Sequence, residues 1–155
     1  MATSPAPGVR KPTPSRPPVQ PRPGPRRDFF VYALELTVTA NSSTAGAIQI
    51  QADSSFELQK LSFFADIALA DQTQSSRVLP LVTLQITDTG TGRFIFNSPV
   101  PIPAIMGDGQ IPFILPTVKT FSPNSSVQIT LANYSAATDY NVNLALIGSK
   151  VFVYG

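Results

Sequence analysis

The sequence predicts an all-β antiparallel sandwich, of the size of an eight-stranded jelly roll, preceded by an extended Pro/Arg-rich N-terminal arm. Two patterns predict the sandwich: apolar and polar side chains alternate along many short segments, and polar turn residues separate these segments. A third observation predicts the arm: nine of the 16 prolines lie within the first 27 residues. A chain of 155 residues is long enough for one domain with a substantial core.

Residues 1–27 are predicted to be the arm, and residues 28–155 the β-sandwich domain. The arm has six cations and no acid, a net charge of +6, whereas residues 28–155 have a net charge of −4. Apart from Val9 and Val19 the arm has almost no aliphatic side chain and no aromatic one, so it cannot bury enough apolar surface to offset the entropy of ordering. Proline favours polyproline II, in which the arm would span about 80 Å.

The first half of the domain predicts four strands. The segments 29–39, 48–51, 56–69 and 78–86 alternate with period two, and the residues predicted to face inward are Phe30, Tyr32, Leu34, Leu36, Val38, Ile48, Ile50, Phe56, Leu58, Leu61, Phe63, Ala65, Ile67, Leu69, Val78, Val82, Leu84 and Ile86. The phase of the third segment changes near Gln59 and Lys60, which predicts a β-bulge or a bend. A helix over 56–70 is the alternative, because this segment contains good helix formers. Turns are predicted at 41–44 and 88–92.

The second half predicts about four more strands, for about eight in all. Residues 93–96 alternate as a strand, and six prolines between Pro99 and Pro123 then predict edge strands and loops, because proline cannot donate to a central ladder. Ile111, Phe113 and Leu115 alternate as one short strand. Val127, Ile129 and Leu131 face the core in the next strand, and Val142, Leu144 and Leu146 in the last, before a predicted break at Gly148 and a closing run to 154.

The composition argues against most enzyme and metal chemistry. The chain has no His, Cys or Trp, which excludes a Ser-His-Asp triad, a Cys-His pair and an ordinary zinc or copper site. A carboxylate pair for glycoside hydrolysis, or a Ca²⁺ ion at Asp88 or Asp108, is less well supported than a set of turns, because the acids are scattered. The segments 90–92 and 107–109 are too short for phosphate-binding loops. We therefore predict no enzyme activity, no cofactor and no metal.

The sequence contains glycosylation sequons but predicts neither a secretory signal nor a membrane span. Asn41, Asn124 and Asn133 each begin a glycosylation sequon, but no apolar signal segment follows the basic residues, so polar turns are predicted at all three. No segment has 18 consecutive apolar residues, which predicts that the chain does not span a membrane.

The basic arm is the feature that most requires a partner. Its six cations are the predicted partner-binding residues, and they are Arg10, Lys11, Arg16, Arg22, Arg26 and Arg27. An acidic protein surface fits them best. Nucleic acid is disfavoured, because the arm has no aromatic side chain to stack on bases and the prolines hold the cations apart. A PxxP-type groove and a plain solubilising tail remain alternatives.

The last third of the chain supports a family resemblance. The run FSPNSSVQITLAN at 121–133, followed by NVNLALIGSKVF at 141–152, resembles the closing strands of small jelly-roll structural proteins of tailed bacteriophages. The motif is one of packing and transfers no catalytic residue. The resemblance implies a virion component of the capsid cement or decoration type, assembled in the host cytoplasm. It also implies that the chain binds the major capsid protein or other virion proteins and forms homo-oligomers, with a trimer as one option.

The predicted function is therefore a non-enzymatic cement protein whose arm clamps neighbouring subunits. Three alternatives stay open. A neck, collar or tail protein would use the same fold in a ring, and a small-virus coat subunit would turn its arm toward nucleic acid. A receptor- or glycan-binding module would need exposed aromatics, for which Tyr134, Tyr140 and Tyr154 are the candidates.

Overall fold

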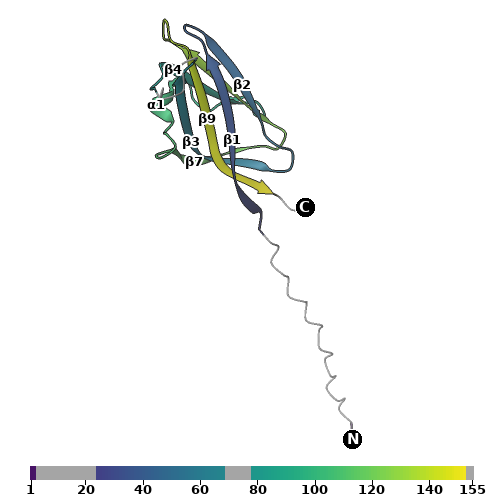
Figure 1. Ribbon diagram of the computed structural model, residues 1–155. Coiled ribbons are helices and arrows are strands. Elements are labelled where there is room, and N and C mark those ends of the chain that lie inside the picture. Colours follow the sequence, from purple (N-terminus) through teal and green to yellow (C-terminus); the bar gives the residue numbers. More distant parts are fainter. Residues whose placement is uncertain (3–23, 69–77, 153–155) are drawn as a thin grey trace.

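The structure is a computed structural model, which describes residues 1–2, 24–68 and 78–152 (Figure 1). Within these ranges the chain forms nine β-strands and one four-residue helix. The elements are β1 (Arg26–Val38), β2 (Ser43–Gln49), β3 (Ser55–Ile67), β4 (Val82–Asp88), β5 (Arg93–Phe94), β6 (Val100–Pro101), α1 (Ile102–Ile105), β7 (Phe113–Phe121), β8 (Ser126–Asn133) and β9 (Tyr140–Phe152). The alternative helix over 56–70 is wrong, because β3 occupies most of this segment.

The strands form two antiparallel sheets packed face to face (Figure 1). The four-stranded sheet has the order β1-β9-β3-β7, and the five-stranded sheet has the order β2-β8-β4, with β5 and β6 both on the remaining edge of β4. Because β5 and β6 share one place, the arrangement is that of an eight-stranded jelly roll with two sheets of four places each. The predicted all-β sandwich is confirmed. The strand predicted at 93–96 is shorter and ends at Phe94.

The core lies between the two sheets and follows the predicted alternation. The inward-facing residues of β4, β8 and β9 are almost fully buried, and every second residue of β1 is more buried than its neighbours. Phe56 and Phe121 are the largest fully buried side chains, and the Tyr32 ring meets the Phe56 ring edge to face with 4.8 Å between centroids. Ile67 departs from the prediction, because it lies at the end of β3 and is exposed.

β3 carries the β-bulge that its change of phase predicts. Its register against β9 and β7 shifts between Leu58 and Lys60. Gly148 lies opposite this bulge and inside β9, so the predicted break at Gly148 is wrong. A Cβ atom at this position would lie 2.0 Å from the carbonyl oxygen of Glu57. The glycine therefore permits a close backbone approach instead of ending the strand.

The proline-rich region 98–123 forms edge elements, as predicted. β7 lies at one edge of the four-stranded sheet and runs through Pro116, so it is longer than the predicted short strand. α1 was not predicted, because four residues are too few to show a helical period.

Two of the three sequon asparagines lie in turns, as predicted. Asn41 and Asn124 have φ angles of 50° and 60°, in the left-handed region that asparagine tolerates in turns. Asn133 instead ends β8 with its side chain buried, so the predicted polar turn is wrong at this position. Its amide nitrogen donates to the carbonyl oxygens of Val38 at 3.0 Å and Thr138 at 2.8 Å. The buried amide therefore joins the ends of three segments of the sandwich.

Candidate partner-binding surface

The last two cations of the predicted arm lie at the start of β1. β1 begins at Arg26, which pairs with Phe152 at the end of β9. The Arg27 guanidinium donates two hydrogen bonds, both of 3.2 Å, to the two carboxylate oxygens of Glu57, and this contact raises the pKa of Arg27. Arg26 makes an ion pair of 2.8 Å with Asp28. Arg10, Lys11, Arg16 and Arg22 lie outside the described residues, so partner binding by the arm stays a prediction.

A buried lysine strengthens the same end of the sandwich. Lys150 of β9 is only 7% exposed, and its ammonium group donates to Gln51, lies 3.5 Å from both carboxylate oxygens of Asp53 and sits 4.5 Å from the centre of the Phe30 ring. A hydrogen bond from Ser54 is the main cause that lowers the pKa of Asp53. Together with the Arg27 pair, this cluster fixes the strand from which the arm extends.

The outer face of the four-stranded sheet, meaning the face that points away from the other sheet, carries exposed apolar residues between the charged side chains of Glu35, Glu57 and Lys60. Phe29 is 76% exposed and Ile114 66% exposed, and both lie on this face with Val31, Val118 and Ile147. Cross-strand register explains how they gather: Val31 pairs with Ile147, so their side chains stand side by side on the outer face. A solvent-exposed apolar surface of this kind is typical of a site that contacts another macromolecule.

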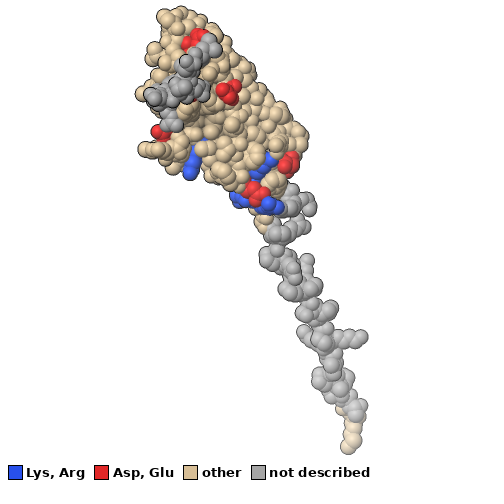
Figure 2. All heavy atoms as spheres, in the orientation of Figure 1, with Lys and Arg blue, Asp and Glu red and all other residues tan. Residues whose placement is uncertain are grey.

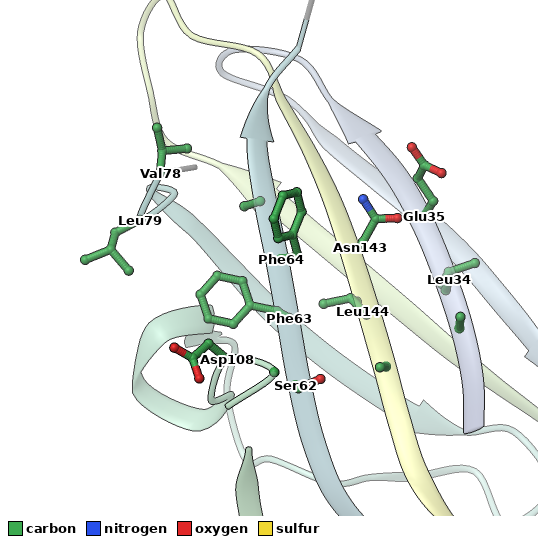
Figure 3. A pocket seen from close by; sticks show the side chains of 14 residues that line it. Leu34, Glu35, Ser62, Phe63, Phe64, Val78, Leu79, Asp108, Asn143 and Leu144 are labelled. Carbon is green, nitrogen blue, oxygen red and sulfur yellow. The ribbon is translucent and has the colours of Figure 1, made fainter. Parts of the chain in front are cut away.

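The outer face contains a hollow of about 680 Å³ (Figure 3). Its floor is a cross-strand row of small residues, in which Ala33 of β1 pairs with Ala145 of β9, and Ala145 pairs with Ser62 of β3. The adjacent row toward the start of β1 has the larger Val31, Ile147 and Lys60. The hollow therefore exists because three neighbouring strands place small side chains in one row.

Two loops build the wall of the hollow along the free edge of β3. The amide of Phe63 donates to the carbonyl oxygen of Gly107 at 2.9 Å, and the amide of Val78 donates to the carbonyl oxygen of Ala65 at 3.1 Å. A Cβ atom on Gly107 would lie 1.8 Å from the carbonyl oxygen of Ile111, so only glycine permits this close approach. These contacts bring Asp108 and Leu79 beside the hollow (Figure 3).

The hollow combines apolar contact area with negative charge. Phe63, Phe64 and Leu79 supply the apolar surface, while Glu35 of β1 and Asp108 of the loop supply two carboxylates. The described residues that line it include no cation. Figure 2 shows the contrast on the visible face: the Lys and Arg side chains gather at the end of the body where β1 begins, and Asp and Glu also lie farther from it.

The two acids predicted as alternative metal ligands have other partners. Asp88 is 2% exposed and forms an ion pair of 3.0 Å with Lys119 of β7, which joins the two sheets. Burial by itself raises the pKa of Asp88, but hydrogen bonds to Lys119 and Thr91 and the charge of Lys119 outweigh this effect and lower the pKa. The carboxylate of Asp108 accepts hydrogen bonds from the backbone amides of Gln110 and Ile111, as in a turn.

Within the described residues, no group of three or more acids lies close enough to hold a metal ion. In the same part of the chain, no helix has the length and apolar character needed to cross a membrane.

The candidate aromatics of a glycan site do not meet. Tyr140 is buried in the core, Tyr134 is exposed, and Tyr154 lies outside the described residues.

Comparison with known proteins gives weak likenesses only. No protein-family model matches the chain, and no curated protein matches it. A chain of the cyanophage Pam1 capsid asymmetric unit is similar over 89% of this chain and 99% of that chain, with 17% identity and a TM-score of 0.45. A chain of infectious bursal disease virus, Gt strain, is similar over 84% of this chain and 38% of that chain, with 9% identity and a TM-score of 0.30. Because both TM-scores lie below 0.5, neither likeness contributes to the argument for function.

The sequence predicts the arm, most of which lies outside the described residues, but it did not predict the exposed apolar residues of the outer face. Phe29 and Val31 lie in β1 and Ile147 lies in the neighbouring β9, and an alternating sequence does not by itself show that outward residues of different strands meet. The sequence does contain one indication of these exposed residues. Positions 29 and 31 lie in the phase opposite to the predicted core residues, and both are apolar instead of polar.

Proposed function

We propose that this chain is a non-enzymatic virion structural protein of the cement type, which binds the capsid and uses its basic arm to clamp neighbouring subunits. The observation that carries the proposal is the combination of an exposed apolar sheet face with a basic arm that starts at the end of the same sheet. The resemblance of 121–133 and 141–152 to phage jelly-roll proteins supports the virion location. In this account the arm is residues 1–27 and the domain is residues 28–155, and Arg26 and Arg27 form the junction because β1 begins at Arg26.

The strand that follows the arm is paired along its whole length with the centre of the sheet. β1 pairs with β9 along 13 residues, from Arg26 opposite Phe152 to Val38 opposite Tyr140, and β9 also pairs with β3. A pull on the arm would act along β1, so it would have to shear this ladder of hydrogen bonds. The bidentate contact between Arg27 and Glu57 adds a cross-strand tie at the point where the load enters.

Many copies would make weak individual contacts effective. Exposed ion pairs contribute only about 0.2–1 kcal/mol each, so no single arm residue can hold a subunit on a capsid. A repeated lattice, however, places both the arm and the apolar face of each copy close to their partners, which raises the effective concentration of the second contact once the first has formed. Screening of the arm charges should make binding weaker as salt increases.

The test replaces arm cations and measures occupancy on purified particles. We expect that Arg10→Ser with Lys11→Ser lowers the number of bound copies and reduces the dependence of binding on salt. The matched control is Arg93→Ser, which removes one charge from β5 on the other sheet and is compared with Arg10→Ser alone. Equal occupancy for the arm variant and the wild type would contradict the clamp, and an equal loss in both variants would point to net charge alone.

A coat subunit that turns its arm toward nucleic acid is the second candidate, because the arm has cations and no acid. It differs from the first in what protects the arm: packaged nucleic acid in one case and protein in the other. Nuclease treatment of opened particles should leave the arm protected from protease if the cement proposal is right.

A further inference from the structure

We propose that the hollow on the outer face receives the Pro/Arg-rich segment 3–23 from the arm of a neighbouring copy of this chain. The inference rests on the proposed clamp and names the surface to which the arm binds.

The hollow has the surface chemistry that a Pro/Arg peptide needs. Proline-rich segments bind shallow apolar grooves that contain aromatic side chains, and Phe64 together with the alanine floor at Ala33 and Ala145 provides such a surface. Glu35 and Asp108 stand at the side of β1 and at the loop wall, so a peptide crossing the floor meets a carboxylate at either side (Figure 3). Arginine pairs well with carboxylates in this setting.

The segment 3–23 is complementary to the hollow in both properties. It contains eight prolines, the four cations Arg10, Lys11, Arg16 and Arg22, and no acid. The described lining of the hollow contains two acids and no cation. A polyproline II chain has little further conformational entropy to lose when it binds, which favours this partner over a flexible basic tail.

The chain's own arm is poorly placed to reach its own hollow. Arg26 begins β1 seven positions before Ala33, which corresponds to about 23 Å along an extended strand. Prolines alternate with other residues from Gln20 to Pro25, and a residue before proline is restricted to extended conformations, so the sequence disfavours a reversal there. A neighbouring copy is therefore the better source.

The first experiment measures binding of a labelled synthetic peptide with the sequence of residues 1–23 to the full chain, by fluorescence anisotropy at low salt. The variant Glu35→Gln with Asp108→Asn removes both charges of the hollow and keeps the oxygen that accepts the backbone amides at position 108. We expect this variant to bind the peptide about tenfold more weakly. Its matched control, Asp28→Asn with Asp139→Asn, removes two charges outside the hollow and should bind like the wild type.

The second experiment fills the hollow without changing charge. Ala33→Trp places a large side chain on its floor, and Ala47→Trp makes the same change on the exposed edge strand β2 of the other sheet. The chain has no other tryptophan. We expect Ala33→Trp to abolish peptide binding and Ala47→Trp to leave it intact. Thermal unfolding of each variant checks that both keep a cooperative fold.

The outcomes separate this inference from the proposed function. Peptide binding that is equal in all four variants, or no binding to the wild type, would overturn the hollow as the arm's site even if the chain proves abundant in particles. Binding that depends on Glu35, Asp108 and Ala33 would support the inference even if the chain is absent from particles, in which case only the virion role fails. Sedimentation velocity tests whether the bound arm comes from a second copy of the chain. Self-association of the full chain that is lost in the hollow variants would support a neighbouring copy. A strictly monomeric chain would contradict it.

Discussion

Replacement of Lys119 by methionine should destabilise the sandwich by about 2 kcal/mol at neutral pH. The change removes the ammonium group 3.0 Å from the Asp88 carboxylate and keeps most of the apolar stem. Asp88 is 2% exposed, so its charge would remain buried with only local hydrogen bonds, such as that from the Gly90 amide at 3.1 Å. The side chain of Lys119 is 31% exposed, which places the pair between the two limits known for ion pairs.

Those limits give the magnitude. Breaking a fully buried pair costs about 3–5 kcal/mol, and an exposed pair contributes about 0.2–1 kcal/mol. A half-shielded pair with one buried partner lies near 2 kcal/mol, which corresponds to a fall in melting temperature of about 7 °C for a domain of this size.

The assay is urea unfolding of the wild type, Lys119→Met, Asp88→Asn and the double variant. We expect a coupling energy of about 1–2 kcal/mol between the two positions, with an unchanged denaturant slope. The loss in Lys119→Met should shrink as the pH falls, because the buried Asp88 then becomes protonated in the variant. A single-variant loss below about 0.5 kcal/mol at pH 7, or full additivity in the cycle, would show that this ion pair does not join the sheets.

Four further predictions concern stability and domain limits. The pKa of Asp88 is lowered in the folded state, so its contribution is present above the unfolded value of 3.8 and should be lost as the pH falls through the folded value; a stability that stays flat from pH 6 to pH 2 would contradict this. Gly148→Ala should cost about 3 kcal/mol, because its Cβ would lie 2.0 Å from the Glu57 carbonyl oxygen, and a stability equal to wild type would show that the bulge is free to shift. Asn133→Ala removes two donated hydrogen bonds and one accepted from a backbone amide, so chemical denaturation should register a loss of about 3 kcal/mol, and a loss under 1 kcal/mol would argue against a structural role. A chain that starts at Gly24 should unfold in one cooperative thermal transition near that of the full chain, and a broad transition would move the domain boundary toward the N-terminus.

The fold was predictable from the sequence because each strand has one face on the core. Because of this constraint, apolar and polar side chains alternate with a period of two along each strand. The inward residues Tyr32, Val127 and Leu144 could therefore be predicted from the sequence. The bulge in β3 was predictable for the same reason, since one extra residue reverses the phase. Gly148 was not, because a glycine that ends a strand and a glycine that admits a neighbouring carbonyl look alike until the pairing partner is known.

The candidate surface was predictable only in part. The basic arm is a local feature of composition, so its chemistry needs no tertiary information. The hollow depends on Ala33, Ala145 and Ser62, which are far apart in the chain and meet only through the register of three strands. Likewise, nothing near Asp88 or Lys119 in the sequence indicates that they pair across the two sheets.

The central claim is that many copies of this chain bind the outside of a capsid built from another protein. The most direct measurement is the copy number and position of the chain in purified particles, by quantitative mass spectrometry together with a particle reconstruction. The account predicts hundreds of copies seated on the shell, with basic arms running between neighbours. A count of about six to twelve copies at one vertex, as a ring would require, or a chain that forms the whole shell by itself, would contradict it.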